Sequence, residues 1–206
     1  SVRPITVFSN SYKSFVFNGG GVSINDRDTT AVVIQYRDNL VHLAEIVDIL
    51  NVGDNPNSAV ISGNLKVLSK GIYDSTNPVN NTESTLSDIN QYNNQVYSID
   101  VLTGIYNASN LISNYDNSIC YFIAEGGVYT LNTNSLNTNL LVNINASVIT
   151  SIVDSYADTD STIAFSEMLY MNDLDNPNLV YEYNRNLSTF TDTITCSGNV
   201  RDIKFY

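Results

Sequence analysis

The sequence predicts an all-β, or nearly all-β, chain of antiparallel repeats, and three observations predict it. Charged residues make up only 15% of the 206 residues, so the polar content comes mostly from Asn, Ser and Thr. Short runs of Val, Ile, Tyr and Thr, which fit a pleated sheet, alternate with residues that form turns. Similar strand–turn patterns also recur along the chain. Together they indicate many short strands joined by tight turns.

The clearest pattern lies between residues 118 and 142. Three apolar runs, at Ile119–Ala124, Val128–Leu131 and Leu140–Val142, are separated by Glu125-Gly126-Gly127 and by an Asn/Thr/Ser turn. The spacing predicts a three-stranded antiparallel unit whose glycines supply the positive φ of a hairpin turn. The segment F-V-F-N-G-G-G-V-S-I-N at 15–25 has the same form.

A second pattern is Val-Tyr-x-hydrophobic followed by Asp or Asn, which occurs at Val96–Asp100, Val128–Asn132 and Val180–Asn184. The longest version, V-Y-S-I-D-V-L-T-G from residue 96, resembles the strand–turn–strand signature of many β-propeller blades. This resemblance is to an architecture rather than to a named family, and it implies a small or incomplete β-propeller-like repeat. A β-sandwich or jelly-roll-like fold would account for the same strands and is the alternative.

Three segments depart from the strand pattern. Leu43, Ile46, Val47 and Leu50 are spaced as on one face of a helix, which favours a helix over 38–51, with a broken pair of strands as the competing interpretation. Residues 74–94 are the least apolar and predict a long loop, either a boundary or a projecting functional loop. We therefore expect a single domain, 1–206, with a subdivision into 1–73 and 95–206 as the variant. Residues 199–206 resemble the first strand of a further unit.

The charge balance narrows the range of partners. Nine basic residues against 21 acidic ones give a net charge of −12, with no basic cluster. Such a field repels phosphate backbones, so nucleic acid and anionic membrane surfaces are not expected partners. No apolar run approaches the roughly 20 residues of a membrane-spanning helix, so no membrane insertion is expected.

Motifs for catalysis are weak in this sequence. His42 is the sole histidine, no serine lies in a G-x-S-x-G elbow, and Cys120 and Cys196 have no metal-ligand spacing. The cysteines are interpreted as two buried thiols, with an inter-strand disulfide as the alternative. Any acidic β protein offers carboxylate pairs, and the sequence does not place them. We expect a protein that is not an enzyme and holds no cofactor.

Candidate binding residues are tyrosines in polar, turn-rich stretches, where exposure favours contact with proteins or sugars: Tyr92, Tyr106, Tyr115 and Tyr156. Candidate calcium ligands are carboxylates at alternate positions of the acidic segment 154–178, although the EF-hand pattern is missing: Asp158, Asp160, Asp173 and Asp175. Solvated acidic loops are the simpler interpretation of these carboxylates.

These observations favour a non-enzymatic structural or protein-interaction module that works through loops on a rigid scaffold. Acidic, Lys-poor, Trp-free β proteins rich in Asn, Thr and Tyr resemble in composition many virus and phage capsid, fibre and tail components. That resemblance implies self-assembly and a location in the virion. The alternative is a carbohydrate-binding or glycan-processing β domain, and outside a virion either an extracellular or a cytoplasmic location fits.

Overall fold

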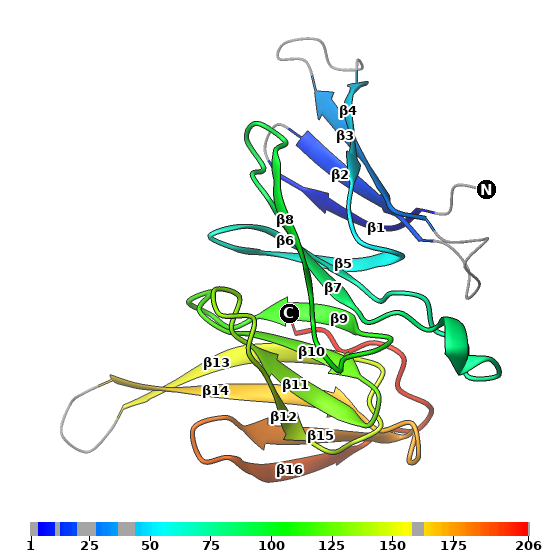
Figure 1. Ribbon diagram of the computed structural model, residues 1–206. Coiled ribbons are helices and arrows are strands. Elements are labelled where there is room, and N and C mark those ends of the chain that lie inside the picture. Colours follow the sequence, from blue (N-terminus) through cyan, green and yellow to red (C-terminus); the bar gives the residue numbers. More distant parts are fainter. Residues whose placement is uncertain (1–3, 11–12, 20–27, 37–43, 158–162, 206) are drawn as a thin grey trace. The chain divides into compact units, whose positions relative to one another are not determined.

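The computed structural model describes residues 4–10, 13–19, 28–36, 44–157 and 163–205, and these form four four-stranded antiparallel sheets (Figure 1). Sheet A contains β1 (Pro4–Ser9), β2 (Lys13–Asn18), β3 (Thr30–Tyr36) and β4 (Ala44–Asn51). Sheet B contains β5 (Pro56–Ser62), β6 (Asn64–Ser69), β7 (Thr85–Ile89) and β8 (Val96–Val101). Sheet C contains β9 (Ser109–Ser113), β10 (Cys120–Ala124), β11 (Gly127–Leu131) and β12 (Thr138–Val142). Sheet D contains β13 (Ile149–Ala157), β14 (Ile163–Asn172), β15 (Leu179–Asn184) and β16 (Thr189–Thr195).

Each sheet is a meander, in which every strand pairs with its neighbour in sequence. Four-stranded antiparallel meanders are the blades from which propellers are built, whereas a sandwich or jelly roll needs Greek-key crossovers, so the sandwich alternative does not hold. The chain divides into two compact units, Ser1–Leu111 and Ile112–Tyr206, and the division falls within β9. The two units are described separately below.

The core of unit 1 lies between sheets A and B. Side chains from the inner face of sheet A pack against side chains of sheet B, and both sets are buried: Phe15, Phe17, Ala31, Val33, Leu50, Val52, Leu65, Val67 and Ile89. The strands of sheet A alternate, because neighbouring residues of a strand point to opposite faces. Aromatic and aliphatic residues on the odd positions of β2 therefore fill this core.

Unit 2 has two apolar clusters, one on each face of sheet D. The inner face contributes to a core with sheet C that includes Tyr121, Val128, Leu169 and Met171. On the outer face, Met168, Tyr170 and Val180 are buried beneath residues of the C-terminal segment: Cys196, Val200 and Ile203. The predicted strand at 199–206 is wrong for residues 199–205, because this segment has no strand pairing and instead covers sheet D.

The predicted helix over 38–51 is also wrong for its described part. Residues 44–51 are β4, which pairs with β3, while residues 38–43, including His42, lie outside the described residues. The pairing skips Val47, since Val33 lies opposite Asp48 and Ile34 lies opposite Ile46. Such a bulge shifts the alternation by one residue, so the apolar side chains acquire a spacing that imitates a helix.

The loop prediction for residues 74–94 is wrong for residues 85–89. These residues form β7, which pairs with β6 on one side and β8 on the other. The rest includes the short 3₁₀ helix Pro78–Asn80 and the turn before β8, joined by irregular backbone. The expectation of a single domain remains a prediction.

The recurring patterns are partly equivalent in the structure. The segment at 118–142 forms β10, β11 and β12 as predicted, and both Phe15–Asn18 and Tyr121–Ala124 belong to the second strand of their sheet. The Val-Tyr pattern falls on the third strand in sheets C and D but on the fourth in sheet B. In the hairpin after β10, Gly126 has the positive φ of 79°. A Cβ on Gly127 would collide with the carbonyl oxygen of Val142 instead.

Two further sequence expectations concern membrane spans and cysteines. None of the helical segments within the described ranges has the length and apolarity of a membrane span. No disulfide joins the cysteines: Cys120 is buried in β10, and Cys196, just after β16, is half-buried.

Candidate functional site

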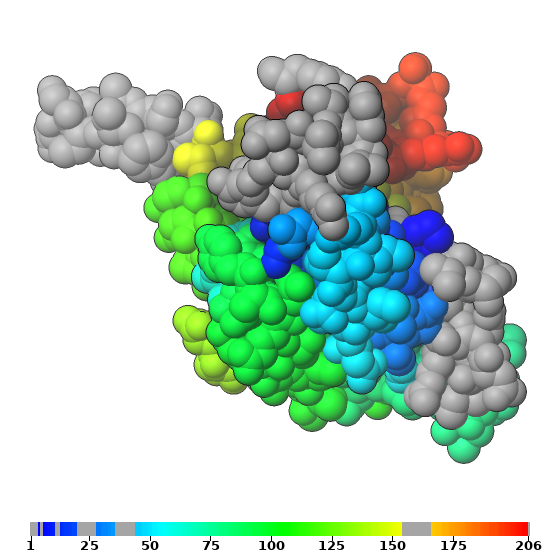
Figure 2. All heavy atoms as spheres, turned by 90° about the horizontal axis from the view of Figure 1, so that it is seen from above, coloured from blue at the N-terminus to red at the C-terminus, as the bar shows by residue number. Residues whose placement is uncertain are grey.

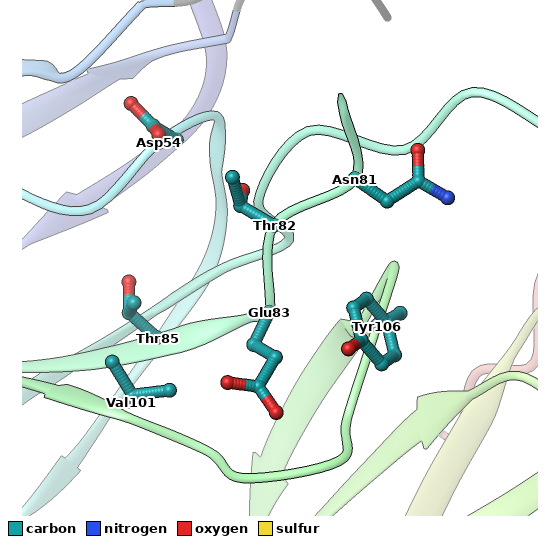
Figure 3. Close-up of a pocket in the computed structure, with 7 residues that line it drawn as sticks. All are labelled: Asp54, Asn81, Thr82, Glu83, Thr85, Val101 and Tyr106. Atoms are coloured by element: carbon teal, nitrogen blue, oxygen red, sulfur yellow. The ribbon is translucent and has the colours of Figure 1, made fainter. Parts of the chain in front are cut away.

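A polar pocket of about 480 Å³ opens in unit 1 and lies in the size range of small-molecule sites (Figure 3). Four separate segments of the chain supply its lining: the turn after β4, the strand entry into β7, the end of β8 and the loop after β8. The lining residues are Asp54, Asn81, Thr82, Glu83, Thr85, Val101 and Tyr106.

Ser84, buried at the entry to β7, holds the pocket loops together. Its hydroxyl donates to the carbonyl of Lys70 at 3.0 Å and accepts the amide of Ala108 at 3.0 Å. Its own amide donates to the carbonyl of Ile105, and its carbonyl accepts the amide of Leu102. One side chain thus ties together the segments on either side of the pocket, so the lining is fixed by hydrogen bonds rather than by a mobile loop.

The upper rim of the pocket depends on a close approach of two backbones at Gly71. Gly71 has φ of +76°, and a Cβ there would lie 2.5 Å from the carbonyl oxygen of Thr82 and 2.8 Å from that of Glu83. Only glycine fits both the conformation and the space. The Thr82 hydroxyl accepts the amide of Ile72, and the Asn81 side chain accepts the amide of Asp74. The side chains on this rim are therefore held in defined orientations.

The chemical groups in the pocket suit a ligand rich in hydroxyls. Glu83 accepts the amide of Gly104 through Oε1 at 2.6 Å, which orients the carboxylate. The half-buried ring of Tyr106 lines the same pocket. Figure 3 shows Asp54 and Glu83 at different ends of the opening, with Thr82 and Thr85 between them. Carboxylates, an amide, hydroxyls and one aromatic ring are the groups with which proteins bind polar, ring-shaped ligands.

Two buried hydroxyls beside Gly53 have no hydrogen-bond partner within the described residues: Ser69 Oγ and Thr85 Oγ1. Both lie against Gly53, because a Cβ on Gly53 would meet the Thr85 hydroxyl and would approach Ser69 Oγ to 3.0 Å. Buried polar atoms normally find a partner in the protein, in water or in a ligand. Thr85 also lines the pocket, so its hydroxyl is a polar group that a ligand or a water molecule could satisfy.

Unit 2 holds a buried cluster of ionisable groups on the inner side of sheet D. The hydroxyl of Tyr121 donates to Glu167 Oε2 at 2.8 Å, and both side chains are buried. Burial raises the pKa of the Glu167 carboxyl, against the Tyr121 hydrogen bond and the positive charge of Arg185, which lower it. Burial, and next the contact with Glu167, raise the pKa of Tyr121.

Arg185 also lines a smaller cavity of about 270 Å³, among Thr130 and Asn side chains. This volume lies below the usual range for ligand sites. Because Glu167 balances the charge of Arg185, we interpret the cluster as structural.

The predicted binding tyrosines are not brought together. Tyr106 lines the pocket, and Tyr92 lies at the opposite end of β8, in the turn before it, with 79% of its surface exposed. In unit 2, Tyr115 occupies the turn between β9 and β10 and is 63% exposed. Tyr156 lies in β13, opposite Ala164, and its side chain is outside the described residues.

The acidic segment is largely strand rather than loop, since β13 extends to residue 157 and β14 begins at 163. Asp158 and Asp160 lie outside the described residues, so their role as calcium ligands stays a prediction. Asp173 accepts the amide of Asp175 and the side chain of Asn176, and Asp175 accepts the side chain of Asn145. Within the described ranges no three His, Cys, Asp or Glu residues gather as a metal site.

Sequence reasoning identified Tyr106 but missed its neighbours. Asn81–Glu83 fall in the segment that the sequence marks as a projecting functional loop, whereas Asp54 stood in an ordinary Gly-Asp-Asn-Pro turn. The one available signal was Gly71, where two backbone segments pass too close for a side chain. That close contact cannot be recognised from the sequence, because it depends on where Thr82 lies in the fold. For Glu167 the signal was a charged residue inside the apolar run S-E-M-L-Y-M.

Neither a family model nor a curated protein sequence matches this chain. Its structure is similar to that of the dihydro-heme d1 dehydrogenase NirN in complex with DHE, with a TM-score of 0.61 and 9% sequence identity. The match covers 95% of this chain but only 38% of the dehydrogenase chain, so the protein spans well under half of that relative. A nidogen/laminin complex gives a TM-score of 0.43 at 10% identity, over 89% of this chain and 76% of the other. At such identities the likeness to NirN is one of fold alone. The chain is an all-β, small or incomplete β-propeller-like repeat of four antiparallel sheets.

Proposed function

We propose that this protein is a non-enzymatic interaction module that binds proteins, including further copies of itself, through the surfaces of its sheets. One observation carries the proposal: the last strand of every sheet is an edge strand, and each exposes large apolar side chains. These side chains are Ile46 and Ile49 in β4, Tyr97, Ile99 and Val101 in β8, Leu140 in β12, and Phe190 and Ile194 in β16.

The three exposed residues of β8 give the strongest support for an interaction surface. Single exposed apolar residues are ordinary, but Tyr97, Ile99 and Val101 alternate along one strand and therefore share one face. The cyan and green spheres of Figure 2, which include β4 and β8, form a broad part of the face in view. A row of this kind on an edge strand is typical of a surface that contacts a partner.

A role in a virus or phage particle, as a capsid, fibre or tail component, is the specific form of this proposal. It is supported by the composition of the sequence and by the repeated antiparallel sheets. Particle components are built from repeated copies, which makes self-association the property to test.

Sedimentation velocity of the purified chain across a wide range of concentration tests the proposal. We expect a defined oligomer whose share rises with concentration. The triple variant Tyr97→Ser, Ile99→Thr, Val101→Thr keeps residues compatible with a strand and tests whether β8 takes part. A chain that stays monomeric at every concentration, and that recovers no partner from particles or cell extracts, would rule the interaction module out.

A second candidate function is carbohydrate binding, and the pocket in unit 1 favours it. Tyr106 offers a ring face, Glu83 and Asp54 offer acceptors, and Thr85, whose buried hydroxyl has no partner within the described residues, also lines the pocket. Sugar hydroxyls satisfy such groups in pairs, while the ring of the sugar stacks on an aromatic side chain. Glycan processing would need in addition two carboxylates held across one bond.

A glycan array, with and without calcium, tests this candidate. If the pocket binds a glycan, Tyr106→Ala and Glu83→Gln should each reduce the signal at least tenfold, about the effect of losing one good contact. Tyr92→Ala is the matched control, because it removes the same type of residue from an exposed turn of the same unit. Equal loss in Tyr92→Ala, or no binding at all, would exclude the pocket as a glycan site.

A further inference from the structure

A further pocket of ligand size opens in unit 2, on the outer face of sheet D. Its volume of about 390 Å³ lies within the range of small-molecule sites. Three strands, β14, β15 and β16, and the turn between the last two supply its lining. The lining includes Ser166, Met168, Glu182, Asn184, Leu187 and Thr191.

Glu182 is the one charged side chain in this lining. Tyr170 donates to its Oε2 and Thr191 to its Oε1, each at 2.6 Å. These two bonds orient the carboxylate but supply no positive charge, and no Lys or Arg of the described residues forms an ion pair with it. Asp192 lies directly opposite Glu182 in the pairing of β15 with β16, which places a second acidic residue beside the first.

The hydroxyl hydrogens around this carboxylate are already donated within the protein. Those of Tyr170 and Thr191 go to Glu182, and Ser166, which accepts Asn184 Nδ2 at 2.8 Å, donates to Met168 Sδ at 3.7 Å. A carboxylate has about four lone-pair sites, and the two hydroxyls occupy two of them. This part of the pocket therefore offers acceptors, and a matching ligand brings donors.

Two apolar side chains line the same pocket. Met168 is 8% exposed, whereas Leu187, in the turn between β15 and β16, is 68% exposed. A ligand with an apolar stem would remove part of the Leu187 surface from water, which favours binding through the hydrophobic effect. The pocket thus combines one fixed negative charge with an apolar wall.

We propose that this pocket binds a primary ammonium group carried on an apolar stem. The ammonium contacts Glu182, and the stem lies against Met168 and Leu187. An ammonium has three donors and no acceptor, which complements the acceptors around the carboxylate. The net charge of −12 also attracts cations to the chain. Free alkylamines and the lysine side chains of other proteins carry this same group. The inference goes beyond the proposed function, because it needs no second copy of the chain.

Titration with pentylamine, followed by two-dimensional amide NMR spectra, tests the site. We expect shifts that gather at the lining residues and a dissociation constant in about the millimolar range, because a solvent-exposed ion pair contributes little. Pentanol has the same stem without the charge, and ammonium chloride has the charge without the stem. Each should bind roughly tenfold or more weakly than pentylamine.

A blocked lysine, Nα-acetyl-lysine methylamide, distinguishes the two sources of the group. If it binds as tightly as pentylamine or more tightly, the pocket accepts the lysine side chain of a partner protein. If it binds more weakly, the pocket is a site for free alkylamines.

Matched variants locate the binding. Glu182→Gln removes the charge but keeps a side-chain oxygen as acceptor, and it should weaken pentylamine binding roughly tenfold or more. Glu125→Gln is the control, because it removes an exposed glutamate from the turn between β10 and β11 of the same unit. It should leave binding unchanged. Leu187→Ser alters an exposed position and should weaken binding about threefold with unchanged melting, so it tests the site even if Glu182→Gln fails to fold.

Three results would overturn the site. Equal binding of pentanol and pentylamine would show that the pocket does not recognise the charge. Equal loss of binding in Glu125→Gln and Glu182→Gln would show that pentylamine responds only to the net charge of the chain. An absence of shifts at the lining residues, up to the solubility limit of the amine, would show that the pocket takes no ammonium group.

Discussion

The first and last sheets differ in what happens to the face turned away from the core. Sheet A leaves Val7, Ile46 and Ile49 exposed, in rows without charge. Sheet D buries Met168 and Tyr170 beneath its own C-terminal segment, and the ring of Phe205 lies 4.7 Å from the ring of Tyr170. One sheet is covered by its own chain, and among the described residues nothing comparable covers the other.

Side-chain and backbone hydrogen bonds further stabilise the covered outer face of sheet D. On the outer face of sheet D the hydroxyl of Tyr170 donates to Glu182 at 2.6 Å, and Thr191 donates to the same carboxylate. The cover is fixed by backbone bonds as well, from Val200 to Pro177 and from Cys196 to Asn178. The outer face of sheet D is thus covered within one chain, whereas the apolar residues on the outer face of sheet A stay exposed within the described residues.

Removing the cover of sheet D should have the largest effect. Deletion of residues 198–206 would expose Met168, Tyr170 and Val180, and at roughly 1.5–3 kcal/mol for each buried side chain it should cost about 4.5–9 kcal/mol. Denaturation in urea, followed by intrinsic tyrosine fluorescence and circular dichroism, measures the loss. The truncated chain should also form larger assemblies by light scattering, because apolar residues on the outer faces of sheets A and D are then both exposed. Unchanged stability would mean that the segment contributes nothing to sheet D.

The fold could be predicted from sequence where an apolar run is followed directly by a recognisable turn. The hairpin of β10 and β11 combines apolar runs with a glycine turn, and it forms as predicted. The strand β4 was only the competing interpretation, because the bulge at Val47 gives its apolar residues a helical spacing. The strand β7 was missed because Ser84 and Ser87 are polar but fully buried, and Ser87 accepts the amide of Gly53.

The candidate site was less predictable for a different reason. Its lining comes from four segments that the pairing of β6, β7 and β8 brings together, and no local pattern records that pairing. Tyr106 was identified by residue type alone. The apolar rows of sheet A likewise need the register of three strand pairs, because a shift of one residue would turn every side chain to the other face.

Matched substitutions on the two outer faces should have a smaller effect and should separate the faces. Phe205→Ala removes a ring packed on Tyr170 and should lower the free energy of unfolding by about 1 kcal/mol. Ile49→Thr on sheet A should change it by no more than about 0.5 kcal/mol in the monomer, because the side chain is exposed and the replacement suits a strand. Chemical denaturation at low protein concentration gives both values. A larger loss for Ile49→Thr than for Phe205→Ala would reverse the assignment of covered and uncovered faces.

The inner faces of sheets A and D differ in charge. We expect this difference to have the smallest effect on stability. Sheet A fills its inner face with Phe15 and Phe17, whereas β14 of sheet D buries Glu167, whose pKa burial raises above the ordinary value of 4.5. The folded state therefore holds this proton more tightly than the unfolded state does. Stability from the group is complete below about pH 4.5 and is lost as the pH rises through the folded-state pKa. Glu167→Gln keeps an acceptor for Tyr121 but does not titrate.

The stability of Glu167→Gln relative to the unchanged protein should therefore increase from about pH 4.5 toward neutrality and then level off. Melting temperatures measured on both proteins across this range give the difference, in which groups common to the two cancel. Asp74→Asn in unit 1 should be flat in this range and show the opposite sign only below about pH 3.8, since hydrogen bonds from Thr76 lower the pKa of Asp74 from its ordinary value of 3.8 and its contribution is lost as the pH falls further. A difference for Glu167→Gln that is flat from pH 4.5 to neutrality would show that the carboxyl in sheet D is not destabilised by its burial. The contrast between an apolar first sheet and a charged last sheet would then lie only on their outer faces.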